Sequence, residues 1–441
     1  MNIGFVSLGC SKNRVDTEIM IGLLKQAGYK IVDQPEKDNI VIINTCGFIT
    51  SAQEESINNI IALGRLKHTG LLRTLIATGC LAQRFGQELL AELPELDAVV
   101  GISSYLDIVS IVKQAQNGKR MLQVAPPATT YIEKGPRVLT TPPGMAYLKI
   151  AEGCNSFCSY CTIPLIRGRL RSFPLPELIQ TARHLVQKQK IRELVLIAQD
   201  TAAYGQDLAE GYGLPDLLEQ LADIEDLQWI RLLYLHPHSF SPQLINAVRH
   251  ISKVVPYLDI PIQHISDSML QAMHRRETSA SIRNLLCNLR DEIPQLTLRT
   301  TIMTGFPGET EADFDQLVDF LQEFKFDWLG VFAFDPQNGT HAYRLEPKIP
   351  LPTAHDRREQ LLQLQQPVTR QKNIKRVGSR SLVLLSQEIG PHLYIGRTAF
   401  QAPEVDGLTV VKSQQKLTPG TMVEVLLKGV RNYDMIGEAV L

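Results

Sequence analysis

Three cysteines lie close together in the stretch Glu152–Cys161. They are Cys154, Cys158 and Cys161, at C-x3-C-x2-C spacing, directly after the strand-like run Ala146–Ile150. A 4Fe-4S cubane normally takes four thiolates, one for each iron, and a loop this short supplies only three. One iron would be left open, and an open iron can chelate a ligand that carries both an amine and a carboxylate. The spacing therefore predicts a cluster with one free corner.

Two other uses of these cysteines remain as alternatives. A zinc knuckle would need a fourth Cys or His nearby, and none lies within ten residues of Cys161. A disulfide loop would need an oxidising compartment. Both alternatives are weaker than the iron–sulfur interpretation.

A second set of three cysteines is spread over the N-terminal third of the chain. Cys10, Cys46 and Cys80 are separated by 36 and 34 residues, and each follows the end of a different strand-like run. Free cysteine is often a small buried hydrophobe, but equivalent placement at three strand ends favours a ligand role. We therefore predict a second cluster, again with one iron not held by cysteine. Cys287, in the helix-like run Ile282–Arg290, has no such partner and is predicted to be a packing residue.

Alternating strands and helices position the second set. The strand candidates are Ile3–Leu8, Asn39–Asn44, Leu72–Thr78 and Ala98–Val100. Helix candidates between them are Val15–Ala27, Ala52–Leu66 and Leu81–Leu93. This order predicts a parallel α/β sheet, in which the carboxyl ends of the strands share one edge.

The middle of the chain repeats the alternation after a weakly patterned segment. Its six strand candidates are Ala146–Ile150, Glu193–Ala198, Trp229–Leu235, Tyr257–Ile262, Leu296–Met303 and Trp328–Phe334. Its helix candidates are Pro176–Lys190, Leu214–Ile224, Pro242–Ile251, Ser281–Glu292 and Glu309–Phe324. Six strands with crossover helices predict a partial (β/α)6 barrel, open on one side, with its functional residues at the carboxyl ends of the strands.

Polar residues at the carboxyl ends of the predicted strands are therefore candidates for the functional site. Past the strands lie Gln199, Asp200, His236, Gln263, His264 and the loop Thr304–Glu309. Asp200, His236 and His264 fit an ordinary structural role as well as a functional one. Arg299, within a strand, would be a costly buried charge unless it meets an anion.

The C-terminal end has a different character. Thr353–Arg376 is helix-like, interrupted at Pro367, and its basic end is predicted to be a solvated face or a linker. From Ser381 the strand-like runs are Leu382–Ser386, Leu393–Gly396, Leu408–Lys412 and Met422–Leu427, which predict a small β-barrel. Five Lys and Arg stand against six Asp and Glu from Ser381 onward, so this barrel is a poor nonspecific RNA clamp.

Composition limits the remaining possibilities. The chain has 441 residues, 45 Lys plus Arg and 46 Asp plus Glu, so no overall charge draws it to nucleic acid or to an anionic membrane. Its apolar runs stop far short of the ~18 residues that a membrane span needs, and no secretory signal is apparent at the N-terminus. The expected compartment is the cytoplasm, without a membrane partner.

With these features in place, nearly the whole chain resembles the methylthiotransferase family of radical S-adenosylmethionine (SAM) enzymes. The family-like motifs are Ser7-Leu-Gly-Cys-Ser-Lys-Asn13, Asn44-Thr-Cys-Gly-Phe48, Thr78-Gly-Cys80, Leu148–Cys161 and Gly305-Phe-Pro-Gly-Glu-Thr310. The terminal barrel looks like the TRAM domain of that family. The resemblance divides the chain into an N-terminal domain (1–117), a linker (118–140), a radical SAM core (141–370) and a TRAM-like barrel (371–441).

Two branches of this family differ in substrate. One methylthiolates an adenosine of tRNA, and the other an aspartate side chain of the twelfth small-subunit ribosomal protein. This chain is similar to the ribosomal-protein branch in Cys10–Asn13, Gln199–Gly205, Asp259–His264 and Ala402–Gly407. The tRNA enzyme stays the alternative, with a non-enzymatic iron–sulfur scaffold or sensor a weaker one.

The resemblance also implies a mechanism. Cys154, Cys158 and Cys161 would hold the cluster that cleaves SAM to a 5′-deoxyadenosyl radical, which takes a hydrogen from the aspartate β-carbon. Cys10, Cys46 and Cys80 would hold an auxiliary cluster that carries the inserted sulfur, and a second SAM would supply the methyl group. By position along the barrel, Gln199, Gln263 and Arg299 are the expected SAM contacts.

The cofactors do the chemistry in this mechanism, so no side chain is expected to act as an acid or base. The cofactors implied are two 4Fe-4S clusters and SAM. The implied partners are the ribosomal protein, an electron donor such as a flavodoxin or ferredoxin, and a sulfur source. A tRNA partner is expected only under the alternative.

Overall fold

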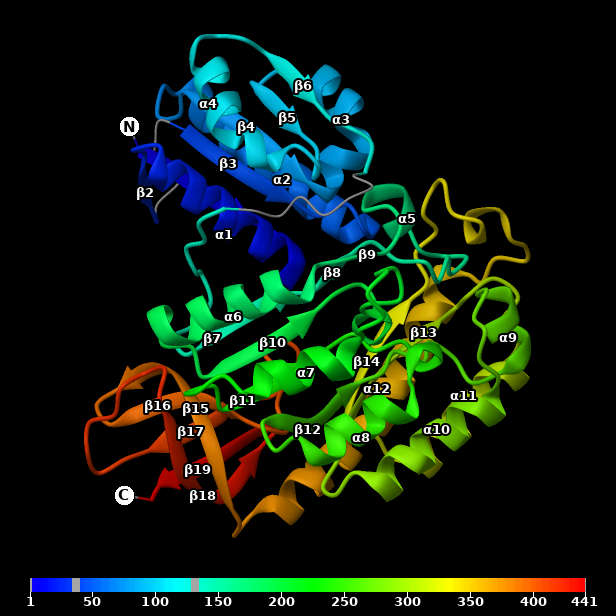
Figure 1. Ribbon diagram of the computed structural model, residues 1–441. Helices are drawn as coiled ribbons and strands as arrows, with labels where there is room; N and C mark the ends of the chain where they lie inside the picture. Colours follow the sequence, from blue (N-terminus) through cyan, green and yellow to red (C-terminus); the bar gives the residue numbers. More distant parts are fainter. Residues whose placement is uncertain (1, 34–39, 128–134, 441) are drawn as a thin grey trace. The chain divides into compact units, whose positions relative to one another are not determined.

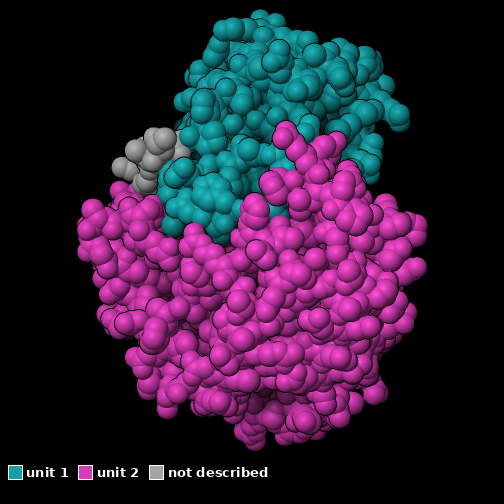
Figure 2. All heavy atoms as spheres, turned by 90° about the vertical axis from the view of Figure 1, so that its right-hand side faces the viewer, with its two compact units in different colours: residues 1–140, 152–171, 337–340 teal, residues 141–151, 172–336, 341–441 magenta. Residues whose placement is uncertain are grey.

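The computed structural model describes residues 2–33, 40–127 and 135–440 (Figure 1). The chain forms two compact units, coloured separately in Figure 2. Unit 1 comprises residues 1–140, 152–171 and 337–340, and unit 2 comprises residues 141–151, 172–336 and 341–441. Both cysteine triads predicted from the sequence therefore lie in unit 1.

Unit 1 is built on a six-stranded, all-parallel sheet with the order β2-β1-β3-β4-β5-β6. Its strands are β1 (Asn2–Ser7), β2 (Lys30–Val32), β3 (Ile40–Thr45), β4 (Thr74–Gly79), β5 (Ala98–Val100) and β6 (Met121–Gln123). Its helices are α1 (Ser11–Gln26), α2 (Thr50–His68), α3 (Cys80–Glu92), α4 (Ile108–Gln116) and the single turn α5 (Ile163–Ile166). The predicted parallel α/β sheet is confirmed.

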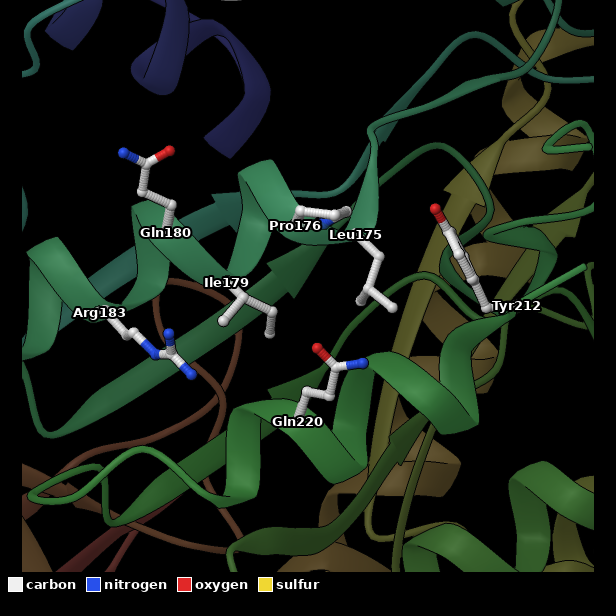
Figure 3. A pocket seen from close by; sticks show the side chains of 7 residues that line it. All are labelled: Leu175, Pro176, Ile179, Gln180, Arg183, Tyr212 and Gln220. Atoms are coloured by element: carbon white, nitrogen blue, oxygen red, sulfur yellow. The ribbon is translucent and has the colours of Figure 1, made fainter. Parts of the chain in front are cut away.

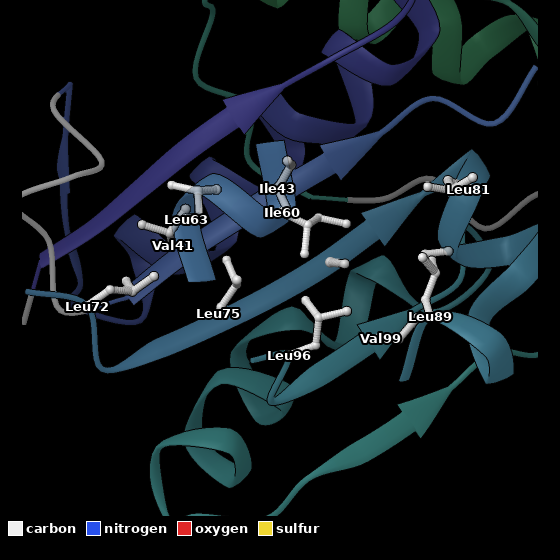
Figure 4. Close-up of a cluster of buried hydrophobic side chains, with 12 residues drawn as sticks. Val41, Ile43, Ile60, Leu63, Leu72, Leu75, Leu81, Leu89, Leu96 and Val99 are labelled. Carbon is white, nitrogen blue, oxygen red and sulfur yellow. The ribbon is translucent and has the colours of Figure 1, made fainter. Parts of the chain in front are cut away.

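The packing of this sheet explains why its central strands could be recognised as apolar runs in the sequence. Every residue of β3 and β4 is buried, because helices cover both faces of the sheet. On one face, Val41, Ile43 and Leu75 pack against apolar side chains of α2 and α3 (Figure 4). Continuous apolar runs of this kind are typical of buried parallel strands.

Two strands of unit 1 have no such signal, and the sequence did not predict them. β2 and β6 are three residues long and partly exposed, so neither forms an apolar run. β6 falls within the segment predicted to be a linker, 118–140, and forms an outer strand of the sheet. Residues 128–134 of that segment, and Asn39 of the predicted second strand, lie outside the described residues.

Unit 2 contains the second parallel sheet, in the order β14-β13-β12-β11-β10-β7. These strands are β7 (Met145–Lys149), β10 (Glu193–Ile197), β11 (Trp229–Leu232), β12 (Val254–Asp259), β13 (Thr297–Thr304) and β14 (Trp328–Ala333). The crossover helices are α6 (Leu175–Gln189), α7 (Leu214–Ala222), α8 (Pro242–His250), α9 (Asp267–Ala272), α10 (Ser279–Glu292) and α11 (Glu311–Phe324). Strand order follows chain order and the outer strands do not pair, as the predicted partial barrel requires. A two-stranded ribbon joins β8 (Ala151–Glu152) to β9 (Arg171–Ser172).

The long helix α12 (Leu351–Arg376) corrects two expectations. It runs without a break through Pro367, because its row of buried residues at four-residue spacing, Leu361, Gln365, Thr369 and Asn373, holds it against the sheet and the barrel. Its basic end is not simply solvated: Lys372 and Arg376 each lie 2.9 Å from a carboxylate oxygen of the buried Asp327.

The C-terminal segment closes into a five-stranded barrel, β15-β16-β17-β19-β18. Its strands are β15 (Arg380–Gly390), β16 (Leu393–Thr398), β17 (Thr409–Lys412), β18 (Met422–Arg431) and β19 (Asp434–Ala439). The predicted barrel is confirmed, with β19 as an additional strand that the sequence did not reveal. No helix among the described residues is long and apolar enough to span a membrane.

A buried ionic network fixes this barrel to the parallel sheet within unit 2. Glu193, the first residue of β10, accepts from Arg231 at 2.7 Å and from Arg397 of the barrel at 2.6 Å. Arg231 also donates to the barrel carbonyls of Thr398 and Ala399. Burial alone would raise the pKa of Glu193, but Arg397 and Arg231 outweigh burial and lower it.

Replacing Glu193 by Gln should destabilise unit 2 by about 3–5 kcal/mol, because two buried guanidinium groups lose their carboxylate. The stabilisation by Glu193 is present above the pKa of the unfolded chain and is lost as the pH falls toward the lower, folded value. Urea unfolding at neutral pH measures the effect. The control is Glu424→Gln, whose pair with Arg380 is exposed and should be worth about 0.5 kcal/mol. Equal effects of the two substitutions would contradict the assignment.

Candidate functional site

The first triad lies at one edge of the unit 1 sheet. Cys10 comes three residues after β1, Cys46 directly follows β3, and Cys80 directly follows β4, and these three strands are neighbours. The turns that carry the thiols also touch: a Cβ added to Gly9 would lie 3.2 Å from Cys46 Sγ. The structure therefore brings together three cysteines that are far apart in the sequence.

Asn13 holds the three cysteine turns in place. Its side-chain amide donates to the carbonyls of Leu8 at 3.1 Å and Thr45 at 3.0 Å, just before Cys10 and Cys46. Because the nitrogen makes both bonds, the carbonyl oxygen faces the other way, 3.4 Å from Cys80 Sγ. One buried side chain thus contacts all three turns.

The turn after Cys46 has a second brace within unit 1. Gly47 O accepts from Arg84 at 3.1 Å and from Gln53 at 3.3 Å. Both side chains also bond Gln337, from the segment 337–340, at 2.6 and 2.8 Å. The turn is therefore fixed by side chains from three separate parts of the chain.

The electrostatic setting of the triad suits a positively charged group. The pKa of Cys80 is raised to about 12 by burial, with smaller contributions from Cys10 and Cys46, against the opposing effect of Arg167. Burial likewise raises the pKa of Cys46. Without a cation these thiols stay protonated, and a bound metal centre supplies the charge that allows them to be thiolates.

The second triad sits on the loop between β8 and α5, also in unit 1. The N–H groups of Ser156 and Ile163 lie 3.4 Å from the sulfurs of Cys154 and Cys161. Backbone donors toward cysteine sulfur are typical of iron–sulfur sites, where they stabilise negative charge on the ligands. Burial raises the pKa of Cys161 well above its ordinary value, and its neighbour Cys158 adds to the effect.

The shape of this loop depends on a close backbone approach at Gly153. Its φ of +75° is accessible to glycine, and a Cβ there would lie 2.1 Å from the carbonyl oxygen of Arg169. Cys154 N then donates to Gly168 O at 3.1 Å. The loop is folded back on the segment that follows it, which fixes the path of the chain around the three thiols.

The donor set of each triad, three thiols, fits the ligands of a 4Fe-4S cluster with one iron left open. None of the seven cysteines, all of which are among the described residues, forms a disulfide bond. Among the described residues, no three His, Cys, Asp or Glu side chains surround one point closely enough to hold a single metal ion. The thiolates of a cubane bind different irons and are therefore spread more widely.

The predicted SAM contacts fall in different places in unit 2. Gln199 lies two residues after β10, and Gln263 lies four residues after β12. Gln263 has a φ of +68°, uncommon outside glycine, and pairs with β13 through Thr301 O at 2.9 Å and Met303 N at 2.8 Å. Both glutamines therefore occupy the carboxyl edge of the sheet.

Arg299 is placed differently. It lies near the start of β13, and its guanidinium meets Asp259 at 2.9 Å and Asp406 of the C-terminal barrel at 3.6 Å. Asp406 also accepts from Tyr257 at 2.7 Å. The anions that neutralise Arg299 are thus the protein's own carboxylates, so it does not fit the expected contact with the SAM carboxylate.

The polar residues for which the sequence allowed both a structural and a functional role form two hydrogen-bonded networks. Asp200 accepts from His236 N at 3.1 Å and Ser239 Oγ at 2.6 Å, and burial raises its pKa. His236 Nδ1 lies 2.9 Å from Glu277. Burial would raise the pKa of Glu277, but the bond with His236 and the charge of Arg275 lower it to about 2. This network ties the loop after β11 to its neighbours.

The second network orders the loop after β13. His264 is fully buried and its Nε2 lies 3.3 Å from Glu309, which accepts from Gly305 N at 2.8 Å and pairs with Arg357. Thr310 caps α11 by accepting from Asp313 N. These contacts assign His264 and Glu309 a structural part in shaping the carboxyl edge.

Two other features lie apart from the predicted site. Cys287 is exposed, so its predicted packing role is wrong: α10 presents it to solvent. A hollow of about 500 Å³ lies between α6 and α7, lined by Leu175, Pro176, Ile179, Gln180, Arg183, Tyr212 and Gln220 (Figure 3). It contains none of the predicted site residues.

Sequence reasoning missed one residue at the centre of unit 1. Arg167 is 1% exposed and contacts Cys80, Asn13, Asp16 and Glu152. The available signal was the first of three arginines, Arg167, Arg169 and Arg171, in the segment after Cys161, and nothing in the sequence distinguishes it from the other two.

Known families match three parts of the chain. Residues 2–101 match the family described as Uncharacterized protein family UPF0004, residues 148–321 match the Radical SAM superfamily, and residues 377–440 match the TRAM domain. The three matches follow the order of the N-terminal sheet, the central sheet and the terminal barrel.

Curated relatives match along the whole chain. A protein of Syntrophomonas wolfei named "Ribosomal protein uS12 methylthiotransferase RimO" is 54% identical, over 99% of this chain and 100% of the relative. Proteins of the same name from Caldanaerobacter subterraneus and Clostridioides difficile are 44% and 43% identical, each over 99% of this chain and 99% and 98% of the relative.

Solved structures support the fold. The radical SAM methyltransferase TsrM from Kitasatospora setae has a TM-score of 0.54 at 12% identity, covering 88% of this chain and 77% of that one. The cobalamin-dependent radical SAM enzyme OxsB has a TM-score of 0.53 at 13% identity, covering 78% of this chain and 54% of that one. At these identities the likeness concerns architecture alone.

Proposed function

Because this chain belongs to the RimO family of ribosomal protein uS12 methylthiotransferases, we propose a division of work between its two cysteine triads. The chain is a radical SAM enzyme that adds a methylthio group to uS12, with SAM and 4Fe-4S clusters as cofactors. The full-length match to RimO proteins carries this conclusion. The acceptor atom we propose is the β-carbon of an aspartate of uS12.

Cys154, Cys158 and Cys161 are the proposed ligands of the cluster that works with SAM. Cys10, Cys46 and Cys80 are the proposed ligands of the auxiliary cluster. When bound, the cofactors supply one-electron cleavage of SAM and the chemistry of sulfur insertion.

The chain's own residues hold and shield these groups. Asn13 sets the spacing of the three turns at the auxiliary site, and Gly153 lets the other loop fold tightly around its thiols. The amides of Ser156 and Ile163 stabilise charge on two ligand sulfurs. No side chain is assigned as a general acid or base.

Gln199 and Gln263 are the proposed SAM contacts, because both lie at the carboxyl edge of the unit 2 sheet, where ligands of such sheets bind. The left-handed backbone of Gln263 is costly for a residue other than glycine, and strain of this kind concentrates at ligand sites. Arg299 is left out of this proposal, since Asp259 and Asp406 already balance its charge.

We further propose working partners and boundaries. The reaction needs an electron donor, such as a flavodoxin or ferredoxin, and a separate source of sulfur. The expected compartment is the cytoplasm, where ribosomes are assembled. Residues 1–117, 141–370 and 371–441 are the proposed domains, joined by the segment 118–140.

Anaerobic turnover with uS12 and tRNA offered together tests the choice of substrate. We expect mass spectrometry to find the methylthio group on an aspartate of uS12 and nucleoside analysis to find none on tRNA. The barrel supports this expectation, because it lacks the positive charge of an RNA clamp. Reactions without SAM are the control. A methylthio group that appears only on tRNA would show that the substrate is wrong.

A further inference from the structure

Arg167 lies between the two cysteine triads within unit 1. It follows α5, six residues after Cys161, and its side chain is 1% exposed. The preceding Ile166 packs in one apolar cluster with Cys80 and Ile102. The end of the loop that carries Cys154, Cys158 and Cys161 thus packs against Cys80, a member of the other triad.

The two arms of the guanidinium have different partners. Nη1 donates to Glu152 at 2.8 Å, and Glu152 begins the loop that carries Cys154. Nη2 lies 2.6 Å from Asn13 Oδ1, 3.2 Å from Asp16 and 3.5 Å from Cys80 Sγ. A single rigid side chain therefore contacts the supports of both triads and one ligand sulfur directly.

The charge of this group is permanent. An arginine guanidinium is not deprotonated in proteins, and this one has the carboxylates of Glu152 and Asp16 as partners. A buried guanidinium is costly unless anions meet it, and here the carboxylates of Glu152 and Asp16 do so at 2.8 and 3.2 Å. The position beside Cys80 consequently carries a full positive charge.

Building on the proposed function, we propose that Arg167 is a positioning residue that sets the reduction potential of the auxiliary cluster through Cys80 Sγ. Reduction adds negative charge to a cluster, and a cation that donates to a ligand sulfur favours the reduced form. Two carboxylates would suffice to satisfy the arginine as a structural ion pair. The contact of Nη2 with the sulfur is the feature that an ion pair alone does not require.

The test uses the full-length chain with Cys154, Cys158 and Cys161 replaced by alanine, so that the only cluster present is the auxiliary one. In this background we expect Arg167→Met to retain about four irons and to shift the midpoint potential to more negative values. Arg167→Lys keeps a cation without the planar fork and should restore part of the shift. Redox titration followed by electron paramagnetic resonance gives both the potential and the spectrum.

Arg169→Met is the matched control, since it removes the same charge from an exposed position two residues away. Its potential should equal that of the parent. The proposal is overturned if Arg167→Met leaves the potential unchanged, or if Arg169→Met shifts it equally. Loss of iron from both Arg167 variants while Arg169→Met retains it would also overturn it, in favour of a purely structural role. A parent without any iron would instead refute the auxiliary site itself.

Discussion

Replacing Cys154, Cys158 and Cys161 together by alanine should abolish SAM cleavage and reduce the iron content from about eight to about four per chain. The reason is that reductive cleavage needs an iron with an open corner next to SAM, and these thiols are the proposed ligands of that cluster. Anaerobic reconstitution followed by iron analysis and measurement of 5′-deoxyadenosine gives both quantities.

Cys287→Ala is the control for this experiment, because that thiol is exposed on α10 and is not part of either triad. It should keep about eight irons and full SAM cleavage. A parent protein with only four irons would contradict the two-cluster site. A parent that holds both clusters but forms no 5′-deoxyadenosine would favour the scaffold or sensor alternative.

The converse variant, with Cys10, Cys46 and Cys80 replaced by alanine, should separate the two halves of the reaction. We expect it to retain about four irons and to form 5′-deoxyadenosine, but to transfer no methylthio group to uS12. In the proposed division of work, SAM cleavage is assigned to the loop after β8 and sulfur insertion to the edge of the unit 1 sheet. Mass spectrometry of uS12 beside nucleoside quantification measures both activities in one reaction.

Methylthio transfer by this variant would refute the role assigned to the auxiliary triad. Loss of SAM cleavage as well would show that the triads do not act separately. Circular dichroism against the parent distinguishes that result from unfolding, since Cys80 belongs to the apolar core of unit 1.

Much of the fold could be predicted because buried strands have a recognisable pattern of apolar residues in the sequence. β3 and β4 are covered on both faces and read as unbroken apolar runs. β2 and β6 are short and partly exposed, and they pair only because the neighbouring strand offers a free edge. A three-residue segment that becomes a strand only by pairing with a distant strand has no sequence pattern of its own.

The break that the sequence predicted in α12 was wrong for the same reason. Pro367 predicts a break, but contacts along one face of α12 outweigh the hydrogen bond that proline removes. Arg299 needed an anion, as the sequence indicated, and the fold supplied two from Asp259 and Asp406, the second of them over a hundred residues away along the chain.

By itself the sequence indicated the two parallel sheets, the terminal barrel and the family, and it predicted two cysteine triads, since short spacings, strand periodicity and motifs are local properties of the chain. Only the tertiary structure decided which side chains contact those cysteines and hold their turns in place. Asn13 spans the turns of Cys10, Cys46 and Cys80, and Arg167 joins that edge to the loop of the other triad. The physical reason is that a hydrogen bond or an ion pair depends on distance in space, and distance in space is set by packing.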